Sequence, residues 1–144
     1  MKRLKIRQIV FTALALLCMA VIFCFSADNS EESNEKSNFF VEQLLEWIPS
    51  GVRENLSYIV RKTAHFTIYA VLGFLVSGIF IPRKIFYTLS VCFLYACTDE
   101  IHQYFVPGRA CRFQDVIIDT SGALFGALIF ALIFRIFSGN KGSA

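Results

Sequence analysis

The chain has 144 residues, of which 56% are hydrophobic, and its formal net charge is +3. This apolar share, together with a mean hydropathy of +0.56, exceeds that of ordinary soluble domains and indicates a membrane protein. The sequence has no basic patch, no phosphate-binding glycine loop and no internal repeat, which argues against a nucleic-acid-binding or nucleotide-dependent protein. We expect an all-α integral membrane bundle of four transmembrane helices, with a short interfacial helix on the outer side.

The first apolar run covers residues 9–25 and contains no charged residue. A cleaved secretory signal peptide is the alternative to a retained helix, but its apolar core is usually only about 7–15 residues long. Phe25 is also too large for the residue three positions before a signal cleavage site. We therefore predict a retained transmembrane helix within residues 1–25. Cytoplasmic segments are rich in lysine and arginine, and a cytoplasmic N-terminus is indicated by Lys2, Arg3, Lys5 and Arg7.

Residues 26–60 are predicted to form an acidic extracytoplasmic loop, because their first part is rich in serine, asparagine and glutamate. Within this loop, the stretch FFVEQLLEWIP (39–49) has an apolar helical face formed by Phe40, Val41, Leu44, Leu45 and Ile48. This pattern predicts a short amphipathic helix that stops at Pro49-Ser50-Gly51. The helix could lie in the membrane interface, anchored by Trp47, or pack on the outer mouth of the bundle.

Three further transmembrane helices are predicted from apolar runs at residues 64–81, 85–105 and 116–134. The middle run is long enough only if it continues through the polar stretch TDEIHQ (98–103). It then spans about 31 Å at about 1.5 Å per residue, enough for a hydrocarbon core of about 30 Å. Residues 61–137 would form a core of three helices, and residues 138–144 a cytoplasmic tail. This topology places all 11 acidic residues on the outer side or in the outer ends of helices.

Polar residues share one face on each of these three helices when the sequence is drawn on helical wheels. The faces comprise Lys62, His65, Tyr69 and Gly73; then Cys92, Tyr95, Asp99, His102 and Gln103, flanked by Glu100; then Asp115, Asp119, Gly122 and Gly126. Their ionisable members lie at the outer helix ends, so the topology predicts convergence on one outward-facing pocket. Arg109 and Arg112 lie in the connecting loop, where Pro107-Gly108 predicts a tight turn that places Arg109 over the pocket mouth.

These polar faces favour a functional site over a purely structural role. A charge facing lipid at mid-membrane costs at least about 2.5–3.5 kcal/mol, whereas interhelical polar contacts contribute only about 0.6 kcal/mol on average. The residues expected to act in catalysis are His65, Asp99, Glu100, His102 and Asp119. The residues expected to bind substrate are Lys62, Tyr69, Gln103, Arg109 and Asp115.

Three kinds of chemistry fit such a set. The histidines and carboxylates could hold a divalent metal that activates water, although no HExxH-like spacing is present. Without a metal, a carboxylate could orient His65 or His102 as general base while Lys62 and Arg109 hold a phosphate or carboxylate group. The same basic residues could instead bind a lipid headgroup or an envelope-active drug without reaction. The 5 cysteines lack ligand spacing, which argues against a disulfide framework or a cysteine zinc site.

Three motifs occur in the order and spacing of a known family: KTAHFTIYAVLGF (62–74), DEIHQYFVPGR (99–109) and FQDVIIDTSGALFG (113–126). Together they resemble the VanZ-like family of bacterial membrane proteins over residues 60–130. The segment FCFSADNSEESNEKS (23–37) is similar to the family's segment after the first helix, except that Asp28 stands where the family commonly has glutamine. The motif residues carried over by position are Lys62, His65, Tyr69, Asp99, Glu100, His102, Gln103, Pro107, Gly108, Arg109, Asp115, Asp119 and Gly122.

The resemblance implies a multi-pass membrane protein of the bacterial envelope, which we expect in the cytoplasmic membrane. The basic N-terminus and the four predicted spans place both termini in the cytoplasm. The family is named for a protein linked to teicoplanin (glycopeptide) resistance, but the resemblance implies no established reaction, so the enzyme question stays open. The expected partners are the lipid bilayer and either a lipid-linked envelope precursor or a glycopeptide-type ligand. A transporter is disfavoured by four spans without a broken-helix pair. A homodimer or an assembly partner would use the small-residue face of Gly122 and Gly126.

Overall fold

The computed structural model describes residues 2–27, 35, 39, 50–80, 85–109 and 111–139. Nearly all of these described residues belong to four helices, and none of them forms a strand. The helices are α1 (Lys2–Ser26), α3 (Ser50–Phe80), α4 (Ile85–Tyr104) and α5 (Phe113–Gly139). The all-α prediction is therefore confirmed. The interfacial helix predicted at residues 39–49 lies outside the described residues, except for Phe39.

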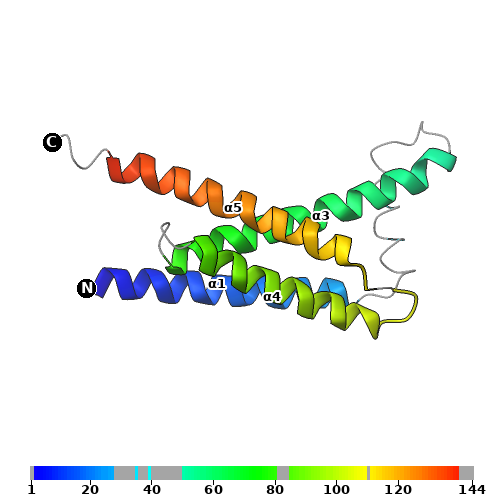
Figure 1. Ribbon diagram of the computed structural model, residues 1–144, viewed down its shortest axis with the longest axis horizontal. Coiled ribbons are helices and arrows are strands. Elements are labelled where there is room, and N and C mark those ends of the chain that lie inside the picture. The colour runs from blue at the N-terminus through cyan, green and yellow to red at the C-terminus, as the bar shows by residue number, and fades with distance from the viewer. Residues whose placement is uncertain are drawn as a thin grey trace.

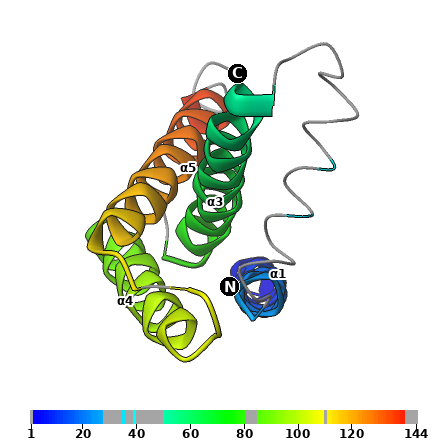
Figure 2. The ribbon, with the colours of Figure 1, turned by 90° about the vertical axis from the view of Figure 1, so that its right-hand side faces the viewer.

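The four helices run alternately in opposite directions (Figure 1). The start of α1 and the end of α5 lie at one end of the bundle, and the connection between α4 and α5 lies at the other. The end-on view shows α3 and α5 side by side, with α1 and α4 as separate neighbours (Figure 2). Of the four helices, α3 packs against all three others, and most extensively against α5. The ends of α3, α4 and α5 that carry the predicted polar residues therefore meet.

Three helices contain segments long enough and apolar enough to cross a membrane: Lys5–Ser26, Tyr58–Phe80 and Phe113–Ser138. The length and apolar composition of these segments support the interpretation of the chain as a membrane protein. The fourth span, predicted at residues 85–105, corresponds to α4, whose C-terminal end carries TDEIHQ. These polar residues lower the average hydropathy of α4, so the fourth crossing stays a prediction.

The start of α3 differs from the prediction. Residues 50–60 were expected to end the outer loop, but they form the first turns of a helix that continues without a break to Phe80. The signal Pro49-Ser50-Gly51 was interpreted as the end of a helix; Ser50 and Gly51 are the first residues of α3, whereas Pro49 and the helix predicted before it lie outside the described residues. Prolines are compatible with the beginning of a helix, because the first N–H groups have no partner within the helix. No further proline occurs before Pro82.

The α3–α5 seam, formed by Gly73, Gly122 and Gly126, brings the two helix backbones into contact. A Cβ atom would lie 1.8 Å from the Ala70 carbonyl oxygen if added at Gly126, and 2.2 Å from the Phe66 carbonyl oxygen if added at Gly122. Small residues allow such close approach between membrane helices. The face of Gly122 and Gly126 is thus covered by α3 of the same chain. It is not available as the dimer surface suggested by the sequence, since wheel analysis does not identify which helix occupies a small-residue face.

Helix α1 belongs to the bundle rather than standing apart from it. The hydroxyl of Tyr95 on α4 donates to the Met19 carbonyl oxygen at 2.6 Å, and the Gln8 side-chain amide donates to the Ile79 carbonyl oxygen at 3.2 Å. The apolar core is formed by Ala15, Ile22, Leu72, Val76, Cys92 and Ala96, among others. All five cysteines are free.

Candidate functional site

Three ionisable side chains from three helices meet in the interior: His65 on α3, Asp99 on α4 and Asp119 on α5. One potential ligand atom from each of them lies within 4.8 Å of the other two. The imidazole Nδ1 of His65 is 3.4 Å from Oδ1 of Asp119, which is within ion-pair range but outside hydrogen-bond geometry. Asp99 is 3% exposed and Asp119 is 0% exposed. We call these three residues the buried centre.

The buried centre is poor in hydrogen bonds. Asp99 Oδ2 accepts a bond from the Gln103 side-chain amide at 3.1 Å, but Asp99 Oδ1 and both carboxylate oxygens of Asp119 have no hydrogen-bond partner among the described residues. The hydroxyl of Tyr69 is also buried without one. An unsatisfied buried polar group costs about 1–3 kcal/mol, and more when it is charged. This arrangement destabilises the apolar core, as is common at sites that bind or react.

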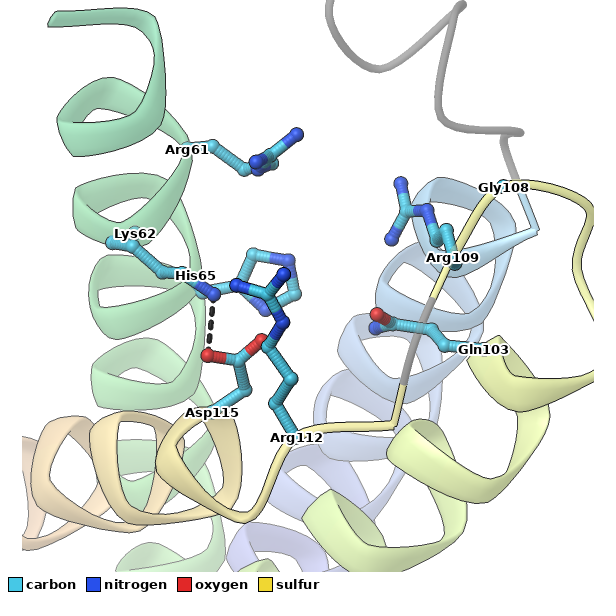
Figure 3. A pocket seen from close by; sticks show the side chains of 8 residues that line it. All are labelled: Arg61, Lys62, His65, Gln103, Gly108, Arg109, Arg112 and Asp115. Atoms are coloured by element: carbon cyan, nitrogen blue, oxygen red, sulfur yellow. Dashed lines mark hydrogen bonds and ion pairs between the residues drawn. The ribbon is translucent and has the colours of Figure 1, made fainter. Parts of the chain in front are cut away.

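A cavity of about 110 Å³ lies at the polar end of the bundle. Figure 3 shows its lining: Arg61, Lys62, His65, Gln103, Gly108, Arg109, Arg112 and Asp115. Four of these side chains are basic, and the single acidic one, Asp115, forms an ion pair with Lys62. We call this space the basic cavity. Its charge favours an anionic occupant.

Two side chains connect the basic cavity to the buried centre. His65 and Gln103 line the cavity, and each also contacts a deeper carboxylate, Asp119 and Asp99 respectively. The site therefore has two layers, a cationic outer layer and an acidic inner layer. A ligand in the cavity meets the inner layer through the imidazole of His65 and the amide of Gln103.

The loop between α4 and α5 is held by a turn and by one buried acid. The Arg109 N–H donates to the Val106 carbonyl oxygen at 3.1 Å, with Pro107 and Gly108 between them and a positive φ of 75° at Gly108. Proline followed by a positive-φ glycine is the pattern of a type II β-turn. The loop is fixed again where Oε2 of Glu100 accepts the Arg112 N–H at 2.8 Å. The predicted turn does place Arg109 at the cavity.

The five residues expected to act in catalysis separate into two groups. His65, Asp99 and Asp119 form the buried centre, whereas the described contact of Glu100 is to the loop. His102 is half-buried and stacks on Phe23 of α1, with ring centroids 4.4 Å apart and an interplanar angle of 27°. It is not a member of the three-residue group. Four of the five expected substrate-binding residues line the cavity: Lys62, Gln103, Arg109 and Asp115. The fifth, Tyr69, lies in the core.

Helix α1 and the start of α3 contribute residues that sequence reasoning missed. The Ser26 side chain is buried beside the Asp99 carboxyl, although its hydroxyl does not reach hydrogen-bond geometry. Phe23 packs on His102, and Arg61 lines the cavity. Two features of the sequence could have pointed to these residues. Ser26 is a polar residue directly after an uncharged apolar run, and Arg61 is a second basic residue next to Lys62.

Membrane-length helices surrounding a buried acid–histidine centre define the class of this protein, a helical membrane protein with a polar interior site. A family model described as VanZ/LLP1 matches residues 11–135, and the chain therefore belongs to this family. The matched region includes most of α1 and extends through α5, so it covers every helix that contributes to the site. The resemblance to the VanZ-like family is confirmed. No curated protein and no solved structure matches the chain.

Proposed function

We propose that this VanZ/LLP1 protein crosses the bacterial cytoplasmic membrane four times, with α4 as the fourth span and both termini in the cytoplasm. The alternating helix directions support this topology, as does the cluster of basic residues before the first apolar run. In this orientation the basic cavity opens on the outer side. Its occupant would then be a molecule of the cell envelope.

The basic cavity would bind a phosphate-bearing headgroup, such as that of a lipid-linked envelope precursor. The observation that carries this proposal is the lining itself: Arg61, Lys62, Arg109 and Arg112 surround one small cavity with a single acid among them. Arginine presents paired N–H donors that match phosphate oxygens, and such charge-assisted bonds are about twice as strong as neutral ones. A lipid chain would remain in the bilayer while the headgroup enters between the helices.

His65 would act as a general base on a molecule held in this cavity. It lines the cavity and has Asp119 behind it, an arrangement in which a carboxylate can orient and stabilise an imidazolium. His65 would take a proton from a water or hydroxyl whose oxygen forms a new bond to the phosphorus of the bound phosphoryl group. The P–O bond to the leaving oxygen would break, and the protonated His65 would then give its proton to that oxygen. A protein that binds a headgroup or an amphiphilic glycopeptide without reaction is the alternative, and resistance to teicoplanin would follow from either activity.

The test of binding uses the purified protein in detergent, with farnesyl phosphate as ligand and farnesol as the uncharged control. Binding of the phosphate is expected to weaken about 100-fold in the Arg109→Gln/Arg112→Gln double variant, since each lost charge-assisted contact is worth roughly 1.5 kcal/mol. Arg135→Gln is the matched control, because Arg135 is exposed on α5 and does not line the cavity. Equal affinity for farnesol and farnesyl phosphate would contradict the proposal.

The test of catalysis measures phosphate release from the same ligand in the wild type and in His65→Gln. We expect bound ligand in both proteins and release in the wild type alone. Binding without release in either protein would support the non-catalytic alternative. Expression of the same pair in a glycopeptide-sensitive host, with the teicoplanin inhibitory concentration as readout, then tests whether resistance depends on the imidazole.

A further inference from the structure

The buried centre has an excess of negative charge. Two carboxylates, Asp99 and Asp119, share one imidazole, and both are nearly or completely buried. Lys62 lies in the layer above and interacts electrostatically with Asp119, but it already forms an ion pair with Asp115. Buried charges are costly unless they are paired or coordinate a metal. One His65 cation could neutralise only one of the two carboxylates.

The separations in the buried centre are close to those of ligands on one metal ion. Two ligand atoms about 2.1 Å from an ion in tetrahedral geometry lie about 3.4 Å apart. The Nδ1 of His65 and Oδ1 of Asp119 are 3.4 Å apart. The third ligand atom, from Asp99, lies within 4.8 Å of the other two. It would have to approach by up to about 1.4 Å to complete a common coordination sphere with bonds near 2.1 Å.

The buried polar atoms without hydrogen-bond partners provide an independent indication of a cation-binding site. Oδ1 of Asp99, both carboxylate oxygens of Asp119 and Nδ1 of His65 are buried without a hydrogen-bond partner among the described residues. The hydroxyl of Tyr69, which belongs to a fully buried side chain and interacts electrostatically with Asp99 and Asp119, lacks one as well. All but the hydroxyl are groups that bind metals, and the hydroxyl could donate to a coordinating carboxylate or to a bound water.

We propose that the buried centre binds one divalent transition-metal ion, of the type of Zn²⁺ or Mn²⁺, through His65, Asp99 and Asp119. An imidazole ligand argues against Mg²⁺ and Ca²⁺, which prefer oxygen, and two carboxylates argue against metals that require thiolates. Three protein ligands leave a position for water or substrate. Because His65 also lines the basic cavity, that position would be near a ligand held there. Because Nδ1 of His65 would be a ligand, the ion would take the place of the His65 general base in the proposed function. The chemical use of the ion therefore rests on the proposed function, whereas its binding does not.

The test measures metal content without any substrate. The wild type, purified in detergent, is stripped with EDTA, loaded with Zn²⁺ or Mn²⁺, freed from excess ion and analysed by inductively coupled plasma mass spectrometry. We expect about one ion per chain in the wild type, and a loss of at least about tenfold in Asp99→Asn, Asp119→Asn and His65→Gln. Asp115→Asn is the matched control. It removes a carboxylate one turn from Asp119 that is already paired with Lys62, and it should keep the ion.

Two results would overturn the proposal: a wild type that holds neither ion after loading, or Asn variants that hold as much as the wild type. Folding of each variant is checked by circular dichroism and size-exclusion chromatography. The wild-type measurement decides the question even if a variant fails to fold. The Arg109→Gln/Arg112→Gln variant separates this inference from the headgroup proposal. This variant should bind farnesyl phosphate more weakly and retain the metal ion. Headgroup binding and metal binding are therefore measured separately, and failure of one proposal does not affect the test of the other.

Discussion

The Nδ1 atom of His65 lies 3.4 Å from Oδ1 of Asp119, and this pair crosses the interface between α3 and α5 next to the point where their backbones touch. Gly122, one turn beyond Asp119, packs on the carbonyl of Phe66, the residue after His65. The absence of a side chain at Gly122 therefore sets the distance between an imidazole and a carboxylate. The packing of the two helices and the geometry of the buried centre depend on the same few residues.

Asp119→Asn is expected to make the metal-free protein at least as stable as the wild type. The change keeps the shape of the side chain and removes one of two buried carboxylates that share a single imidazole, so the cost of burying an unpaired charge falls. Thermal unfolding in detergent with EDTA measures this effect. A marked decrease in the unfolding temperature would indicate that Asp119 holds the helices together. Added Zn²⁺ or Mn²⁺ should stabilise only the wild type, since only a folded protein with an intact site gains from binding.

Gly122→Ala is expected to destabilise the bundle by about 1–3 kcal/mol, the usual cost of overpacking. The new methyl group would lie 2.2 Å from the Phe66 carbonyl oxygen, so the helices would have to separate. Thermal unfolding is the measurement, with Ser121→Ala as control, because Ser121 is exposed on the same helix. The separation would also move Asp119 away from His65, and metal content should fall in parallel. An unchanged unfolding temperature for Gly122→Ala would contradict the tight interface.

Glu100→Ala is expected to loosen the loop between α4 and α5, whereas Glu100→Gln should not. The carboxylate accepts the Arg112 N–H at 2.8 Å, and a glutamine amide oxygen can accept the same bond. Hydrogen exchange at residues 105–112 reports the difference. Exchange of the Arg112 amide should become about 10-fold faster in the alanine variant, which corresponds to roughly 1.4 kcal/mol. Equal acceleration in both variants would show that the charge, rather than the hydrogen bond, fixes the loop.

Tyr95→Phe is expected to lower the stability by about 1 kcal/mol, because it removes the hydrogen bond to the Met19 carbonyl oxygen without changing the ring. Tyr104→Phe is the matched control on the same helix, since the Tyr104 side chain is 67% exposed. Thermal unfolding of the two variants in one detergent isolates the bond between α1 and α4. If the two substitutions have the same effect, the Tyr95 bond does not contribute to stability.

Periodicity in the sequence was sufficient to predict the helices and to place His65, Asp99 and Asp119 on inward faces of three neighbours. It could do so because these helices are joined by short connections at alternating ends, which restricts how they can pack. Their roles in function stay predictions. The position of Ser26 beside Asp99 was not predictable in the same way. A long segment separates α1 from α3 in the sequence, so the sequence does not restrict where α1 packs on the other helices. The start of α3 was missed because proline is common at the beginning of a helix as well as shortly after its end.

Helix α3 carries Arg61 and Lys62 at the basic cavity, His65 at the buried centre and Gly73 at the α3–α5 seam. An α-helix with an intact hydrogen-bond ladder moves as a rod, with about 1.5 Å of rise per residue. A shift or rotation of this rod would displace the cations of the outer layer and the imidazole of the inner layer together. The two layers are mechanically linked, so a ligand that draws Lys62 inward would also reset the position of His65 against Asp119.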